Sequence, residues 1–192
     1  GYKWEDEWNT DAGKYKIYTE YEKEIAGDDI GAYFTFETKE GEAIEVQVGV
    51  SFVSIENARL NLNTEQPKFA FDEVHANARK MWNENLSKIE VEGGTTDQKT
   101  VFYTALYHML IHPNILQDVN GQYPMMESSK IGTTQGNRYT VFSLWDTYRN
   151  VHQMMTLLFP DRQLDMIRSM IDIYNEHGWM PKWELYRRET YT

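Results

Sequence analysis

Apolar residues change their spacing along this chain, and that change restricts the folds it can adopt. Between residues 44 and 52 every second side chain is apolar, namely Ile44, Val46, Val48, Val50 and Phe52. A period of two predicts a β-strand that is buried on one face. After residue 63 the apolar side chains recur three to five positions apart, which is typical of amphipathic helices. The pattern therefore predicts a β-rich first part followed by a helical second part.

The β-rich part contains two further candidate strands. Residues 32–36 are rich in strand-forming side chains and precede a turn that contains Gly41. Residues 15–25 alternate less regularly and are also expected to form a strand. Together with the strand at 44–52, these segments predict a β-domain in the first third of the chain.

Four helices are expected in the second part, and their ends carry recognisable signals. Gly93 and Gly94 close the first helix and indicate a domain boundary. Thr95, Thr96 and Asp97 provide N-cap chemistry for the second helix, which stops at Pro113. Pro160 ends the third helix, and Gly178 follows the fourth. The expected ranges are 71–89, 95–112, 143–159 and 161–177.

A long connection, residues 114–142, separates the second helix from the third. It contains Asn120–Gly121, which is the strongest short hairpin signal in the chain. Residues 139–142 are expected to pair back as a short strand.

Composition excludes several classes of function. Acidic residues outnumber basic ones by 30 to 19, which gives a net charge of −11. Nucleic-acid binding needs a cationic face, so nucleic acid is not expected as a partner. The chain has no cysteine, which excludes disulfides, thiolate metal sites and cysteine nucleophiles. No apolar run approaches the ~20 residues that cross a bilayer, so no membrane span is expected.

Two short patterns have features of metal sites but lack the remaining ligands. His108 and His112 have the spacing of a zinc pair, but Met109 stands where a zinc protease has glutamate. Residues 118–121 begin like a calcium loop, and the further acidic ligands of such a loop are missing. Ordinary histidines and a hairpin are therefore favoured, and no metal ligand is assigned.

Residues 142–149, with the sequence FSLWDTYR, admit two interpretations. In the structural one, Ser143 and Asp146 form a capping box and Trp145 lies in the core. In the functional one, Trp145 stacks on the apolar face of a sugar while the Asp146 carboxylate accepts hydrogen bonds from its hydroxyls. The residues alone favour the structural interpretation, because helix caps are common and sugar sites are rare.

A second aromatic cluster follows the fourth helix. It contains Trp179, Lys182, Trp183, Glu184 and Glu189, in a loop that should emerge at one end of a helical hairpin. Loops held by a rigid frame often carry binding sites. The alternative is a structural loop fixed by two buried indoles.

Several segments together resemble glycoside hydrolase family 92, the calcium-dependent α-mannosidases. They are residues 48–62 (VGVSFVSIENARLNL), 102–108 (FYTALYH), 118–123 (DVNGQY), 142–149 (FSLWDTYR) and 178–183 (GWMPKW). The resemblance covers roughly residues 28–192 in the family's order. It implies an α+β multidomain segment. Residues 1–63 would end an N-terminal β-sandwich, 64–94 would form a linker helix, and 95–192 would supply the first helical hairpins of an (α/α)6 toroid.

The resemblance also implies an activity. Family enzymes are exo-acting, inverting α-mannosidases that remove terminal α-linked mannose from glycans, and most are bacterial and exported. The segment is thus expected to be periplasmic or secreted, with glycans and the remainder of a longer parent chain as its partners. The catalytic acid, the base and most calcium ligands would lie beyond Thr192. No catalytic residue is therefore assigned, and the segment alone is expected to be inactive.

The resemblance assigns part of a sugar-binding wall to this chain. It therefore reverses the preference for the structural interpretation of residues 142–149. Trp145 and Asp146 match the family's Trp-Asp motif. Neighbouring pattern positions are matched by Arg149, Lys182, Trp183 and Glu189. Many members have Gly-Asn where this chain has Arg187–Arg188, a difference at the substrate rim. Two alternatives stay open: a non-catalytic carbohydrate-binding or scaffold protein of the same fold, and a glucosidase-like toroidal hydrolase.

Overall fold

The computed structural model describes residues 2–3, 8–10, 13–15, 18–19 and 34–190. The chain divides into two compact units, Gly1–Ile44 and Glu45–Thr192. In the first unit, β1 (Tyr2–Lys3) pairs antiparallel with β4 (Tyr18–Thr19), and β2 (Trp8–Thr10) pairs with β3 (Gly13–Tyr15). Of the strand expected over 15–25, the described residues 15, 18 and 19 belong to the short strands β3 and β4, and residues 16–17 and 20–25 lie outside the described residues. The strand expected over 32–36 is not formed in its described part, residues 34–36.

The strand predicted at 44–52 was wrong, because the segment is extended but pairs with no described strand. Its apolar side chains are exposed, with Val46 and Val48 each 74% accessible. Phe52 stacks on the Tyr186 ring at a centroid distance of 4.5 Å, and the polar side chains make further contacts: the Gln47 amide donates to the carbonyls of Gln66 and Lys68. A strand is stabilised by a neighbour that takes its backbone hydrogen bonds, and the described residues supply none here.

Helix α1 (Ile55–Glu65) follows within the range expected to end the sandwich, and the apolar pattern did not predict it. Ser54 caps it by accepting a hydrogen bond from the backbone N–H of Asn57. The backbone approaches the helix closely at Gly49, where a Cβ would lie 2.3 Å from the Ala58 carbonyl oxygen. Only glycine allows that approach.

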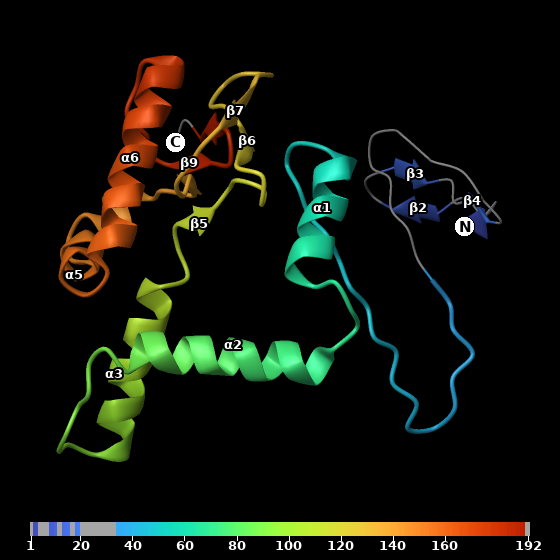
Figure 1. The fold of residues 1–192 in the computed structure, drawn as a ribbon, viewed down its shortest axis with the longest axis horizontal. Coiled ribbons are helices and arrows are strands. Elements are labelled where there is room, and N and C mark those ends of the chain that lie inside the picture. Colours follow the sequence, from blue (N-terminus) through green and yellow to red (C-terminus); the bar gives the residue numbers. More distant parts are fainter. Residues whose placement is uncertain (1, 4–7, 11–12, 16–17, 20–33, 191–192) are drawn as a thin grey trace. The chain divides into compact units, whose positions relative to one another are not determined.

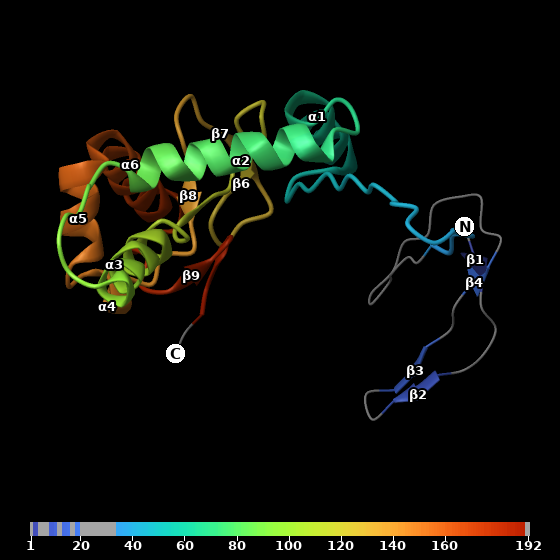
Figure 2. The ribbon, with the colours of Figure 1, turned by 90° about the horizontal axis from the view of Figure 1, so that it is seen from below.

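Helices α2 (Phe71–Leu86) and α3 (Thr96–Met109) confirm two of the four predicted helices, and both can be followed in Figures 1 and 2. The expected cap of α3 is a full capping box, in which Thr95 and Gln98 each bond the other's backbone N–H. The rings of Trp82 and Tyr107 join α2 to α3 at a centroid distance of 4.7 Å.

The connection after α3 forms two small antiparallel pairs. Strand β5 (Asn114–Ile115) pairs with β8 (Tyr139–Thr140), which confirms the strand expected near 139–142. Strand β6 (Gln122–Pro124) pairs with β7 (Ile131–Thr133). A tight turn does form at Asn120–Gly121, closed by the Gly121 N–H on the Asp118 carbonyl, with Gly121 at a φ of 82°. The hairpin itself is closed later, by residues 125–130, so the prediction placed its turn wrongly.

The last helical region differs from the prediction in one respect. The third helix is interrupted: α4 (Leu144–Thr147) and α5 (Val151–Leu158) are separated at Asn150, whose φ of −151° is not helical. Helix α6 (Pro160–His177) begins with Pro160 and ends at Gly178, which has a φ of 90°, as predicted. Two short strands, β9 (Glu184–Leu185) and β10 (Arg188–Glu189), close the described chain.

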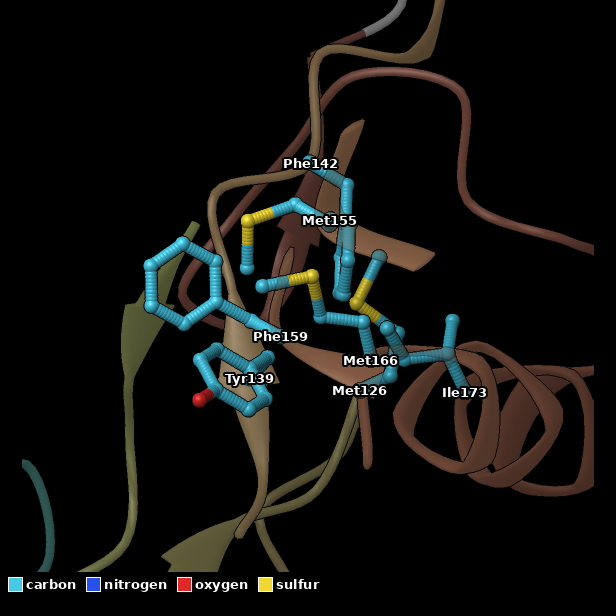
Figure 3. Close-up of a cluster of buried hydrophobic side chains, with 7 residues drawn as sticks. All are labelled: Met126, Tyr139, Phe142, Met155, Phe159, Met166 and Ile173. Carbon is cyan, nitrogen blue, oxygen red and sulfur yellow. The ribbon is translucent and has the colours of Figure 1, made fainter. Parts of the chain in front are cut away.

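One hydrophobic core lies among β8, α5 and α6 (Figure 3). Its buried members are Met126, Tyr139, Phe142, Met155, Phe159, Met166 and Ile173. Helices α5 and α6 pack against each other around it. Phe142 belongs to this core, so its buried side chain anchors the segment that follows β8. In the part of the chain that the structure describes, no helix is long and apolar enough to span a membrane.

Candidate functional site

The two aromatic clusters predicted from the sequence lie side by side. Ser143 and Trp183 form an antiparallel β-bridge, and the backbone N–H of Leu144 donates to the carbonyl of Lys182 at 3.2 Å. These bonds join the segment that leads into α4 to the segment that leads into β9. The two clusters therefore meet along one edge, which we call the rim (residues 143–149 and 182–189).

Two indoles lie on this rim. The rings of Trp145 and Trp183 have centroids 5.6 Å apart and are tilted by 51°. Trp145 is 52% exposed, and Trp183 is half-buried. The Trp145 indole N–H donates to the Ser143 hydroxyl at 3.1 Å, which fixes the direction of its ring. The prediction of a buried structural Trp145 was wrong.

Asp146 lies next to Trp145 with its side chain exposed. Its carboxylate accepts a hydrogen bond from the Ser143 hydroxyl. Ser143 occupies the N-cap position of α4, yet its side chain makes no capping bond to the backbone. The capping box suggested by the sequence is therefore not formed, and the serine instead orients both Trp145 and Asp146.

Glu189 closes the neighbouring loop from β10. One carboxylate oxygen accepts from the backbone N–H of Trp183 at 2.7 Å and the other from that of Lys182 at 3.1 Å. The carboxylate is half-buried and the Lys182 side chain is exposed. Glu189 is thus held beside both indoles, with part of its acceptor capacity already used by the backbone.

Arg149 is placed less centrally than the other candidates. It lies exposed in the break between α4 and α5, and its guanidinium is 5.7 Å from the centre of the Tyr148 ring. Among the described residues, no side-chain hydrogen bond or ion pair connects it to the other five candidates. The structure thus brings together Trp145, Asp146, Lys182, Trp183 and Glu189.

Two glutamates of the site had no assigned role from the sequence. Glu127 accepts the backbone N–H of Glu189 at 3.0 Å, and its own N–H donates to the Arg187 carbonyl at 2.8 Å. Glu184 is buried under the rim and accepts from the Thr140 hydroxyl and the Phe142 N–H. Burial raises the pKa of the Glu184 carboxyl above its ordinary value of 4.5, and the hydrogen bonds from Phe142, Thr140 and Val141 oppose that rise.

The described residues do not fit a calcium or zinc site. No group of three or more His, Asp or Glu side chains in the described ranges has a metal-binding arrangement. Asp118, from the loop with partial calcium character, already accepts hydrogen bonds from Ser51, Asn57 and Asn61. The calcium ion implied by the resemblance would need ligands outside these residues.

Comparison with known proteins decides the family. The model of the glycosyl hydrolase family 92 catalytic domain matches residues 57–192. The chain belongs to glycosyl hydrolase family 92. The search of curated proteins gave no match.

Solved structures of family 92 enzymes agree with this assignment. One is the α-mannosidase of this family from Bacteroides thetaiotaomicron, with a TM-score of 0.68 and 35% sequence identity. The match covers 73% of this chain and 19% of that enzyme. A second family 92 glycosyl hydrolase matches with a TM-score of 0.61 and 25% identity, over 66% of this chain and 17% of its own. The chain thus spans about a fifth of these enzymes.

Family 92 membership confirms the resemblance drawn from the sequence motifs. It identifies the rim as part of a glycoside hydrolase catalytic domain. Sequence reasoning missed Glu127, because its link to Glu189 joins the β6–β7 connection to β10 across a long stretch of chain. The signal for Glu184 was only its position beside Trp183.

Proposed function

We propose that this chain is part of an exo-acting, inverting α-mannosidase that hydrolyses terminal α-linked mannose from glycans. In this proposal it contributes part of the sugar-binding wall. Family membership supports a glycosidase, and one similar structure is named an α-mannosidase. The observation that carries the proposal is the exposed Trp145 indole beside Trp183, with the Asp146 carboxylate at its edge.

The geometry of this rim suits a pyranose ring. An indole face packs against the apolar C–H face of a sugar, which buries area without leaving a polar group unpaired. A carboxylate accepts charge-assisted hydrogen bonds from hydroxyls, and these are about twice as strong as neutral ones. Trp145 would therefore stack on the terminal mannose while Asp146 accepts from its hydroxyls.

Inversion requires two carboxyl groups, one that protonates the leaving oxygen and one that activates water. The described glutamates near the rim already accept hydrogen bonds from the protein. Glu184 is buried and accepts from the Phe142 N–H, and Glu189 accepts from two backbone N–H groups. In this proposal the acid, the base and most of the calcium ligands lie in the part of the enzyme outside this chain. The segment alone is expected to be inactive.

The proposal extends to architecture and location. Residues 1–63 would complete a β-sandwich, 64–94 would link it to an (α/α)6 toroid, and 95–192 would begin that toroid. Exposed apolar side chains on α6, such as Leu164, Ile167 and Ile171, are consistent with helices that pack on it in the complete domain. The enzyme would be periplasmic or secreted.

The test is an activity assay on the complete protein. Release of nitrophenol from 4-nitrophenyl α-mannoside, abolished by a calcium chelator, is the expected result. Hydrolysis of the α-glucoside instead would identify a glucosidase-like enzyme. Binding of mannosides without turnover would favour the non-catalytic carbohydrate-binding alternative. The absence of both binding and turnover would overturn the proposal.

A further inference from the structure

Glu184 lies directly beneath the rim and connects its two sides. It is only 1% exposed, and it directly follows Trp183. Its carboxylate reaches across to the end of β8, where one oxygen accepts from the Thr140 hydroxyl at 2.9 Å and the other from the Phe142 N–H at 3.1 Å. One buried side chain thus links the arm that carries Trp145 and Asp146 to the arm that carries Trp183 and Glu189.

The backbone that Glu184 holds is strained. Val141, between Thr140 and Phe142, has a φ of 65°, which is a left-handed conformation that β-branched residues rarely adopt. Such a conformation is unfavourable and persists only where its surroundings impose it. Glu184 is hydrogen-bonded to the residue on each side of Val141, so it holds this turn from both sides.

Strain of this kind is concentrated at the rim. The described chain has three non-glycine residues with positive φ: Glu127 at 47°, Val141 at 65° and Tyr186 at 61°. Tyr186 lies in the turn between β9 and β10, and the Glu127 N–H bonds to Arg187 in that same turn. All three therefore belong to the two arms or to their direct contacts, and strained backbone of this type clusters at functional sites.

A carboxylate suits this position because it accepts hydrogen bonds on both oxygens. A glutamine of the same shape has one accepting oxygen and one donating nitrogen. The Thr140 hydroxyl can rotate to accept from that nitrogen, but a backbone N–H cannot. Glu184→Gln therefore keeps the packing but replaces charge-assisted hydrogen bonds by neutral ones, which are about half as strong, and so weakens the clamp on the turn at Val141.

We propose that Glu184 is a positioning residue of the sugar-binding wall, which holds the left-handed turn at Val141 and so sets the spacing between Trp145–Asp146 and Trp183–Glu189. It does not touch the sugar. The inference rests on the proposed function for its consequence in catalysis, while the positioning itself can be measured without substrate.

The kinetic test compares two buried glutamates in the complete protein. Glu184→Gln should lower kcat/KM for 4-nitrophenyl α-mannoside about ten- to hundredfold, mainly through KM, because small misplacements of binding groups are costly. The matched control is Glu176→Gln. Glu176 also has a buried side chain and accepts from Tyr123, Met126 and Arg138, none of which lies on either arm. That variant should melt at a lower temperature and keep kcat/KM within about twofold.

The second readout is hydrogen exchange followed by mass spectrometry, which needs no substrate. Glu184→Gln should speed exchange in both segments 140–148 and 182–190, whereas Glu176→Gln should speed it around 123–126. If Glu184→Gln destabilises too strongly, Thr140→Val removes one of the clamping bonds. It should give a severalfold smaller loss of kcat/KM and faster exchange in the same two segments.

The outcomes separate the two proposals. Unchanged exchange at 140–148 and 182–190 in both variants, or a loss of stability with kcat/KM retained as in Glu176→Gln, would overturn the positioning role. Absence of mannoside turnover in the wild-type protein would defeat the proposed function instead, and the exchange data would still decide whether Glu184 couples the two arms.

Discussion

The backbone N–H of Trp183 donates a 2.7 Å hydrogen bond to the carboxylate of Glu189, which lies on the opposite strand of the β9–β10 pair. The same carboxylate accepts from the N–H of Lys182. The loop that presents the Trp183 indole is therefore shaped by Glu189, whatever contact Glu189 makes with a ligand. A residue that both shapes a loop and borders a site affects stability as well as binding when it is replaced.

Replacing Glu189 by alanine should lower the free energy of unfolding by about 1 kcal/mol, because two backbone donors lose their acceptor and water replaces it only in part. Glu189→Gln keeps one acceptor and should lose less. Urea denaturation monitored by circular dichroism measures both. The control is Glu92→Ala, at an exposed position, which should leave the midpoint unchanged. Equal midpoints for Glu189→Ala and Glu92→Ala would show that the bonds contribute nothing.

Asp146→Ala should weaken sugar binding and leave stability nearly unchanged, in contrast to Glu189→Ala. The side chain is exposed and caps no helix, so the melting temperature should change little. Loss of charge-assisted hydrogen bonds to a sugar should cost about 1.5–3 kcal/mol, or roughly ten- to hundredfold in kcat/KM of the complete enzyme. Ser143→Ala, which removes only the orienting hydroxyl, should have a smaller effect. Melting lowered by several degrees with turnover intact would instead favour a structural Asp146.

The sequence predicted the elements whose stability is local or whose apolar stripe is continuous. Helix α3 has a complete capping box at Thr95, and α6 has Pro160 at its start and Gly178 at its end. Helix α1 was missed for a physical reason: its buried side chains are Asn57 and Asn61, so it has no apolar stripe to detect. Its inner face is instead polar: both side-chain amides donate to Asp118, and their oxygens accept from Asn120 and Val119.

The extended segment 44–52 shows the same limit. Alternation identifies which side chains share a face, but not which face meets the rest of the protein. Here the polar face, with Gln47 and Ser51, makes the hydrogen bonds, and of the apolar face Phe52 stacks on Tyr186. Likewise Trp145, Asp146, Trp183 and Glu189 could be picked out from motifs. Their supports Glu127 and Glu184 could not, since those act through long-range bonds to the backbone.

The raised pKa of Glu184 gives a pH-dependent prediction. A carboxyl whose folded pKa lies above its unfolded value binds more protons in the folded state, so wild-type stability falls as pH rises above about 4.5 through the folded pKa. Glutamine does not titrate, so Glu184→Gln does not lose stability in this way as pH rises. The melting temperature of the variant relative to wild type should therefore be lowest at about pH 4 and become more favourable toward about pH 7. The exposed control Glu92→Gln should show no such trend, and a difference that moves the other way would contradict the raised pKa.

Asp118 offers the sharpest test of how the polar face of α1 is held. It is 5% exposed and accepts hydrogen bonds from the Ser51 hydroxyl and from the side-chain amides of Asn57 and Asn61, each at 2.7 Å. Asn61 in turn accepts the N–H of Val119. This carboxylate is thus the centre of the contact between α1 and the turn at residues 118–121.

Asp118→Asn should lower the free energy of unfolding by about 2–4 kcal/mol, because an amide nitrogen would face donors that an oxygen now satisfies. The matched control is Asp97→Asn, exposed in the first turn of α3, which should cost less than about 1 kcal/mol through the helix dipole. A double-mutant cycle with Asn61→Ala should give a coupling of about 1 kcal/mol or more, since the two side chains share a bond. Additive effects would mean that α1 is held by packing, and that its buried asparagines do not depend on Asp118.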